Sequence, residues 1–158
     1  MKNLFIAATL FFCSLGYASA QSITVQAGDG KPVSFSRADL EAMPHIKVTA
    51  GRPDQQDVFE GTLLRNVLEK AGVTFGESLR GKRLASYALI EAADDYKVVI
   101  ALPELDPDFT DKQIILAFTK DGKPLDAKEG PYRIVIPDEK RMARWVRQVT
   151  VIKVVDAQ

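Results

Sequence analysis

The residues that could do chemistry in this chain are few. Among 158 residues there is one histidine, His45, and one cysteine, Cys13. A zinc site usually takes three or four nitrogen or sulfur ligands, and a Ser-His-Asp triad needs its histidine beside a serine on a strained turn. The chain has no Gly-x-Ser-x-Gly motif. We therefore expect no metal site and no catalytic residue, and we interpret His45 as a structural residue at a strand edge.

A second candidate is the acidic pair Asp94 and Asp95, which is followed by Tyr96. Adjacent residues in a strand or turn point to different sides, so these carboxylates would not share a proton. Asp is also common in turns, where its side chain bonds to the local backbone. We predict a tight turn here, with Tyr96 packed in the core or at the rim of a pocket.

The one local excess of positive charge lies in the C-terminal third of the chain, beside the only tryptophan, Trp145. It consists of Arg133, Lys140, Arg141, Arg144 and Arg147, with Asp138 and Glu139 between them. Guanidinium groups beside an aromatic face suit a carboxylate, a phosphate or a flat anion. Two interpretations stay open, a solvated loop and an anion site, and Arg52 would join the site if its loop folds over the same cleft.

Composition narrows the functional classes. The 21 basic and 21 acidic residues balance, which argues against a nucleic-acid partner. The first 20 residues read as a secretory signal peptide, with Lys2, an apolar run over 4–15 and a small-x-small cleavage signature ending at Ala20. That run is too short to span a membrane. We expect residues 21–158 to form one domain in the periplasm or outside the cell, with no membrane contact after cleavage; lipidation of Cys13 is a minor alternative.

Residues 21–158 contain no cysteine, which excludes disulfides, thiolate metal ligands and Fe–S clusters from this part of the chain. Hydrophobic periodicity predicts a helix over 37–43, capped by Ser36 with Asp39, and a second helix that has Thr62 as its N-cap and ends at Gly72. Residues 50–59 read as an irregular surface loop. The predicted strands cover 22–26, 33–35, 45–49, 84–91, 96–102, 114–119, 132–136 and 146–155. This pattern predicts an α+β domain with small mixed or antiparallel sheets and two main helices. Eleven apolar residues of these elements are predicted to be largely buried: Leu63, Leu64, Val67, Leu68, Leu89, Val98, Ile100, Ile115, Leu116, Ile134 and Ile136.

Several segments, in this order, resemble the molybdopterin-binding domain of the sulfite oxidase family. They are Phe59-Glu60-Gly61-Thr62-Leu63-Leu64, Ala93-Asp94-Asp95-Tyr96, Ile115-Leu116-Ala117-Phe118 with Asp121-Gly122-Lys123-Pro124-Leu125, Gly130-Pro131-Tyr132-Arg133-Ile134-Val135-Ile136-Pro137, and Arg144-Trp145-Val146. The resemblance implies that family's fold over about three quarters of residues 21–158. It also implies a pocket edged by Tyr96, with basic residues of the Arg133 to Arg147 region near a pterin phosphate.

The chain departs from this family at one decisive position. Family enzymes bind molybdenum through a cysteine thiolate in the segment ahead of the Phe59 motif, where this chain has Val48-Thr49-Ala50-Gly51-Arg52. We therefore expect an exported, non-catalytic domain without a cofactor, which binds a small anionic or flat acidic ligand or a protein partner. The candidate ligand-binding residues are Arg52, Tyr96, Arg133, Arg144 and Trp145. The alternative is a molybdopterin-dependent oxidoreductase that holds its cofactor without a cysteine.

Overall fold

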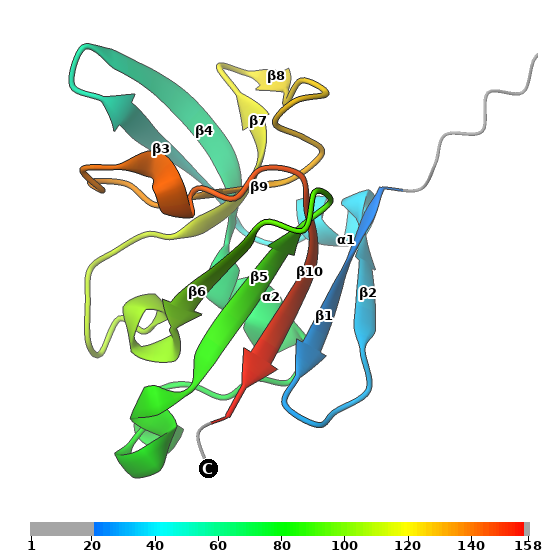
Figure 1. Ribbon diagram of the computed structural model, residues 1–158, viewed down its shortest axis with the longest axis vertical. Helices are drawn as coiled ribbons and strands as arrows, with labels where there is room; N and C mark the ends of the chain where they lie inside the picture. The colour runs from blue at the N-terminus through cyan, green and yellow to red at the C-terminus, as the bar shows by residue number, and fades with distance from the viewer. Residues whose placement is uncertain (1–20, 157–158) are drawn as a thin grey trace, which may run out of the picture.

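The computed structural model describes residues 21–156, so the predicted signal peptide and Cys13 lie outside the described residues. Two five-stranded sheets and two short α-helices make up the described part (Figure 1). The first sheet has the strand order β2-β1-β10-β5-β6, and the second has β3-β4-β7-β8 with β9 also paired to β7. This architecture confirms the predicted α+β class.

The bounds of the elements are as follows. The strands are β1 Ser22–Ala27, β2 Val33–Ser36, β3 His45–Arg52, β4 Gln55–Leu63, β5 Tyr87–Ala92, β6 Lys97–Ala101, β7 Ile115–Lys120, β8 Lys123–Pro124, β9 Arg133–Val135 and β10 Val149–Val155. The helices are α1 Arg37–Glu41 and α2 Leu64–Lys70, and the 3-10 turns are η1 Gly76–Ser78, η2 Gly81–Ala85, η3 Leu102–Leu105 and η4 Met142–Arg144.

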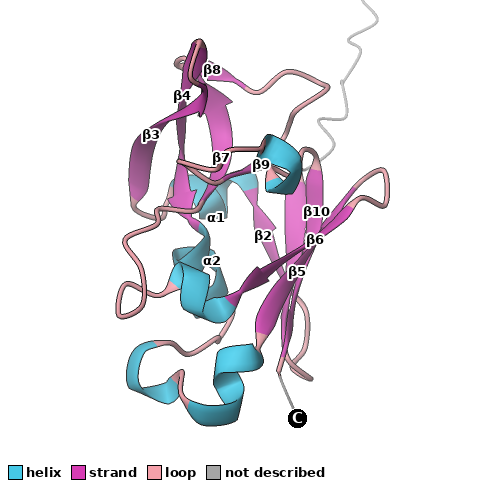
Figure 2. Ribbon diagram, turned by 60° about the vertical axis from the view of Figure 1, so that its left-hand side comes forward, coloured by secondary structure: helices cyan, strands magenta, loops and turns pink. Residues whose placement is uncertain are grey.

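The first sheet joins the two ends of the described chain. β1 and β2 form the predicted hairpin, and β10 adds parallel to β1, with Thr24 opposite Val151. β10 also pairs antiparallel with β5, which pairs with β6. α2 lies on one face of this sheet (Figure 2). The last strand therefore completes a sheet that the first strand begins.

The second sheet corrects the predicted loop at 50–59. β3 and β4 pair without interruption from His45–Thr62 to Arg52–Gln55, so this segment is a hairpin with its turn at Pro53 and Asp54. The sequence concealed the strands over 50–59 because most of these positions are polar and exposed, and only Ala50 and Phe59 are buried. A long polar run therefore looked like a loop.

The two helices differ in how they begin. At α1 the predicted capping box is present, because the Asp39 amide donates to Ser36 Oγ (3.2 Å) and the Ser36 amide donates to Asp39 Oδ2 (2.8 Å). Thr62 was wrongly predicted as the cap of α2: it belongs to β4 and is fully buried. The helix follows directly from the strand, and the Leu64 amide donates to the Ile114 carbonyl (2.9 Å).

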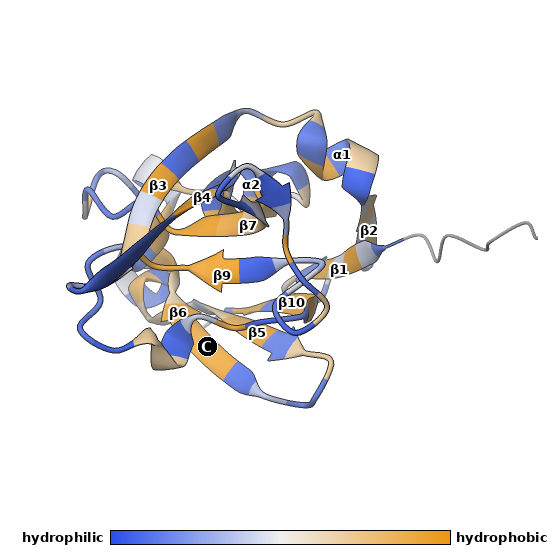
Figure 3. Cartoon of the chain, turned by 90° about the horizontal axis from the view of Figure 1, so that it is seen from above, coloured by the Kyte–Doolittle hydropathy of each residue, from blue (hydrophilic) through white to orange (hydrophobic). Residues whose placement is uncertain are grey.

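Both sheets and α2 enclose one hydrophobic core. Nine of the eleven residues predicted to be buried are buried: Leu64, Val67, Leu68, Val98, Ile100, Ile115, Leu116, Ile134 and Ile136. Leu63, the last residue of β4, is only half-buried. Leu89 is also half-buried, because it lies on the opposite face of β5 from Ala88 and Ile90. Apolar residues predominate along β7 and β9 (Figure 3). Within residues 21–156, no helix has the length and apolarity needed to cross a membrane.

Candidate ligand-binding site

Three of the five predicted site residues line one cavity of about 720 Å³. Tyr96 comes from the turn before β6, Arg133 begins β9, and Trp145 follows η4. We call this space the Arg133 cavity. Its lining consists of Ala92, Asp94, Tyr96, Ala127, Lys128, Arg133, Met142, Ala143, Trp145, Arg147 and Gln148. Residues 49 positions apart in the sequence therefore meet at one opening.

Arg133 is the central cation of this cavity and is only 8% exposed. Its guanidinium carbon lies 5.4 Å from the centre of the Phe59 ring and 5.3 Å from the centre of the Trp145 ring. The two rings meet edge to face at 5.8 Å. The Arg133 Nη1 donates to Glu129 Oε1 (2.5 Å). Aromatic faces and one carboxylate thus hold the guanidinium in place while leaving its Nε free of any acceptor among the described residues.

A second cation stands beside the same aromatic ring. Lys120 Nζ lies 5.7 Å from the centre of the Phe59 ring and 2.7 Å from Asp57 Oδ2. The hydrogen bond to Asp57 raises the pKa of Lys120 against the opposing effect of burial. Lys120 therefore stays charged, and its carboxylate partner neutralises it at short range.

Tyr96 forms the rim of the Arg133 cavity. Its side chain is half exposed, and its hydroxyl donates to the Ala143 carbonyl (2.7 Å), linking the turn before β6 to η4. The predicted acidic turn is present: Asp94 Oδ1 accepts the Tyr96 amide (3.2 Å), and Asp95 has a φ of 65°. The predicted turn is therefore present, and Asp94 lines the cavity together with Tyr96.

Arg144 does not line the Arg133 cavity, contrary to the prediction that all five residues share one cleft. Its Nη1 and Nη2 donate to Glu104 Oε1 (3.1 Å) and Oε2 (3.2 Å), and its Nε donates to Glu139 Oε1 (2.8 Å). A further contact joins Nη2 to Glu139. The hydrogen bond to Glu104 raises the pKa of Arg144, and this effect outweighs burial, which lowers the pKa. Two carboxylates therefore use the donors of this guanidinium.

Arg52 lies in a neighbouring cavity of about 640 Å³, which also departs from the prediction. The physical reason is the β3–β4 hairpin, which holds Arg52 at its tip and prevents it from folding over Arg133. Lys140, Arg141 and Glu139 line the same space. Met142 lines both cavities, so the two spaces are neighbours.

Sequence reasoning missed the carboxylates that neutralise this region. Glu129 stands four positions before Arg133, a short spacing that could have suggested the pair. Glu104 is 40 positions from Arg144, and no local pattern connects them. His45 lies on an edge strand, as predicted: it begins β3, and its ring meets the Phe118 ring edge-on at 4.9 Å.

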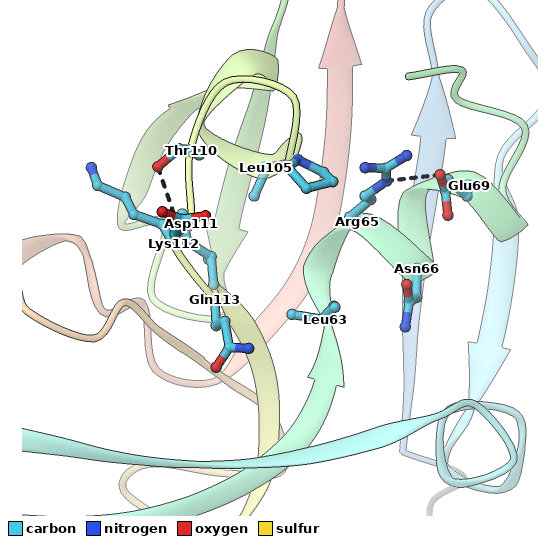
Figure 4. A pocket seen from close by; sticks show the side chains of 11 residues that line it. Leu63, Arg65, Asn66, Glu69, Leu105, Thr110, Asp111, Lys112 and Gln113 are labelled. Atoms are coloured by element: carbon cyan, nitrogen blue, oxygen red, sulfur yellow. Dashed lines mark hydrogen bonds and ion pairs between the residues drawn. The ribbon is translucent and has the colours of Figure 1, made fainter. Parts of the chain in front are cut away.

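Another cavity, of about 510 Å³, lies between α2 and residues 107–114 (Figure 4). Its cations are already paired. Arg65 Nε donates to Glu69 (2.8 Å) and its Nη1 to Asp106 (3.2 Å), while Lys112 Nζ donates to Glu104 (3.3 Å). Because these charges compensate one another locally, the Arg133 cavity is the better candidate for an anionic ligand.

The described residues do not fit protein coordination of molybdenum. Residues 48–52, where the resemblance places the family's cysteine, form part of the regular strand β3. No cysteine occurs in residues 21–156, and this part of the chain holds no group of three or more His, Cys, Asp or Glu side chains placed to bind a metal. A soft thiolate ligand is therefore not supplied here.

Residues 55–158 match the family model described as the oxidoreductase molybdopterin binding domain. The chain belongs to this family. No curated protein sequence matches it, whereas 26 chains of solved structures do. Among them is the crystal structure of the sulfane dehydrogenase SoxCD from Paracoccus pantotrophus, with a TM-score of 0.66 and 19% identity. The likeness covers 85% of this chain and 38% of that chain, so this chain spans well under half of its structural relative.

These comparisons confirm the resemblance to the sulfite oxidase type of molybdopterin-binding domain and its fold. At 19% identity the likeness to SoxCD concerns the fold alone. The family match begins at Gln55, at the start of β4, so β3, with the segment Val48 to Arg52, lies ahead of it.

Proposed function

We propose that this chain is a non-catalytic ligand-binding domain that keeps the molybdopterin-binding fold and binds a small anionic or flat acidic ligand in the Arg133 cavity. The observation that carries the proposal is the structure of residues 48–52. They form a fully paired hairpin strand without a thiolate. A centre that needs a soft protein ligand finds none there.

The pairing of Arg144 supports the same proposal. In the family, basic residues of this region lie near an anionic cofactor. Here Glu104 and Glu139 engage Arg144 from two sides. Like charge repels, so two carboxylates beside this cation oppose the approach of a phosphate. Arg133 is also paired, with Glu129, but its Nε has no acceptor among the described residues, and Lys128 and Arg147 add positive charge to the cavity that Tyr96 borders.

Metal analysis of the purified full chain tests the proposal. The chain is expressed in a host that makes the molybdenum cofactor, beside a family enzyme that retains its cysteine as the positive control. We expect molybdenum far below one atom per chain, together with an absorption spectrum of tyrosine and tryptophan only. Stoichiometric molybdenum in this chain would overturn the proposal.

A second candidate function is a molybdopterin-dependent oxidoreductase, and membership of the family favours it. In that case Arg133, Arg144 and their neighbours would hold the cofactor without a cysteine. Visible absorption above the aromatic bands in the same preparation would support this alternative. The metal analysis and the spectrum therefore separate the two candidates in one experiment.

A protein partner in place of a small ligand belongs to the same class of binding function.

We also propose export to the periplasm or beyond, on the pattern of residues 1–20. Fractionation of cells that express the full chain tests export: the mature amino terminus is expected at Gln21 in the exported fraction. A chain that keeps Met1 inside the cell would contradict it.

A further inference from the structure

Two buried N–H groups at the Arg133 cavity have no acceptor. They are Nε of Arg133 and Nε1 of Trp145, whose residues are 8% and 4% exposed. Neither nitrogen has a hydrogen-bond partner among residues 21–156. Buried donors are nearly always satisfied, because leaving one unpaired costs free energy. These two donors belong to residues that line one cavity, so an acceptor that reaches this place would be bound by both.

The two donors belong to side chains in direct contact. The guanidinium carbon lies 5.3 Å from the centre of the indole ring, and Phe59 packs against both. Both residues line the Arg133 cavity. Glu129 holds Nη1, which restricts rotation of the guanidinium. The donors are therefore pre-organised, and an acceptor that reaches them pays little ordering cost.

The charge around the cavity favours a singly charged acceptor. Arg133 is neutralised by Glu129, so the pair adds no net charge. Among the lining residues, Lys128 and Arg147 are basic and Asp94 is acidic, which leaves one net positive charge. A carboxylate matches this charge, whereas a phosphate dianion exceeds it.

Apart from the polar Gln148, the remaining lining residues are apolar. Ala92, Ala127, Ala143 and Met142 line the cavity between the charged groups. Resting on the proposed ligand-binding function, we propose that this site binds a small monocarboxylate with an apolar body, one carboxylate oxygen accepting from Arg133 Nε and Trp145 Nε1. Because both nitrogens are covered, a lining side chain must shift to admit the oxygen. Met142, unbranched and half-buried, is the one best able to do so.

Trp145 supplies the test, because it is the only tryptophan in the chain and gives a single indole N–H signal in a 15N-correlated NMR spectrum. The full chain is titrated with butyrate and benzoate, and separately with inorganic phosphate and sodium chloride at equal ionic strength. We expect a saturable downfield shift of this signal with the carboxylates only. A signal that carboxylates leave unchanged, or that phosphate shifts at lower concentration, would overturn the proposal.

Two variants locate the binding by calorimetry. Arg133→Lys keeps the charge but removes Nε, and we expect it to weaken carboxylate binding about tenfold or more. Lys31→Gln removes an exposed cation that does not line this cavity, and we expect a change of less than about threefold. Equal losses in both variants would contradict a directional contact with Arg133. If Arg133→Lys does not fold, the NMR titration of the unchanged chain still tests whether carboxylates bind at Trp145.

The outcomes for this inference and for the proposed function are distinguishable. A molybdenum-free chain whose indole signal ignores carboxylates refutes the carboxylate site and leaves the ligand-binding function standing. Stoichiometric molybdenum refutes the proposed function itself.

Discussion

Glu104 and Arg144, 40 positions apart in the sequence, form a two-point ion pair in which Nη1 meets Oε1 at 3.1 Å and Nη2 meets Oε2 at 3.2 Å. The pair joins η3 to η4. Lys112 adds a third contact to the same carboxylate at 3.3 Å. Arg144, which the sequence analysis predicts to contact a ligand, therefore connects two 3-10 turns of the fold instead.

This ion pair predicts a loss of stability in acid. Burial raises the pKa of Glu104, but hydrogen bonds from Arg144, Lys112 and the Ala101 amide outweigh it and hold the pKa below its ordinary value of 4.5. A lowered pKa in the folded state means that the contribution is fully present above about pH 4.5 and is lost as the pH falls through the folded pKa.

We therefore expect Glu104→Gln to lose about 1 kcal/mol of unfolding free energy at neutral pH. The variant should also show a weaker decline below pH 4.5 than the unchanged chain. Denaturant melts between pH 3 and 7 measure both. Glu77→Gln, at an exposed position, is the matched control and should follow the unchanged chain. Parallel pH curves for Glu104→Gln and the unchanged chain would contradict the assignment.

Among the carboxylates, Asp106 is predicted to contribute most to the stability of the fold. It is fully buried and accepts from the Gly76 amide (2.6 Å), the Asp108 amide (3.1 Å) and Arg65 Nη1 (3.2 Å). Burial raises its pKa, and these bonds together lower it below the ordinary value. Asp106→Asn should cost about 2 to 4 kcal/mol, because it leaves Arg65 without a charged partner there. Thermal melts with the exposed Asp111→Asn as control test this, and equal stabilities would refute it.

Gly61 is predicted to tolerate no side chain. It lies at the irregularity between β4 and β7, and a Cβ there would come within 2.1 Å of the Leu116 carbonyl oxygen and 2.6 Å of Ala117 Cα. These are backbone atoms of a buried strand, so they cannot move aside cheaply. Gly61→Ala should cost about 2 kcal/mol or more in a denaturant melt. Its neighbour Glu60→Ala should cost less than about 1 kcal/mol, and a tolerated Gly61→Ala would contradict the strand contact.

Leu68 tests the core. It is fully buried on α2, and the described chain has no disulfide to compensate for its loss. Leu68→Ala should cost about 2 to 5 kcal/mol. Leu84→Ala removes a leucine that is 42% exposed and should cost less than about 1 kcal/mol. A loss below about 1 kcal/mol for Leu68→Ala would show that α2 packs loosely.

Local sequence patterns were enough to predict several elements of this protein and its family. Ser36 and Asp39 predicted a capping box because their bonds span three residues, and alternation predicted the β1–β2 hairpin because period-two patterns report a half-buried strand. The order of motifs from Phe59 to Trp145 identified the family. These features depend on neighbours in sequence, or on motif order along it, and need no knowledge of distant contacts.

Tertiary structure decided which of the predicted site residues meet in one cavity. Tyr96, Arg133 and Trp145 meet because β9 pairs with β7 and η4 returns to the turn before β6, and sequence spacing encodes neither relationship. Arg52 was misplaced because the polar outer face of an edge hairpin looks like a loop. Arg144 was misassigned because Glu104, which neutralises it, comes from 40 residues away. A charge in sequence shows that a side chain can bind an anion, but only packing determines whether a carboxylate of the same chain already does so.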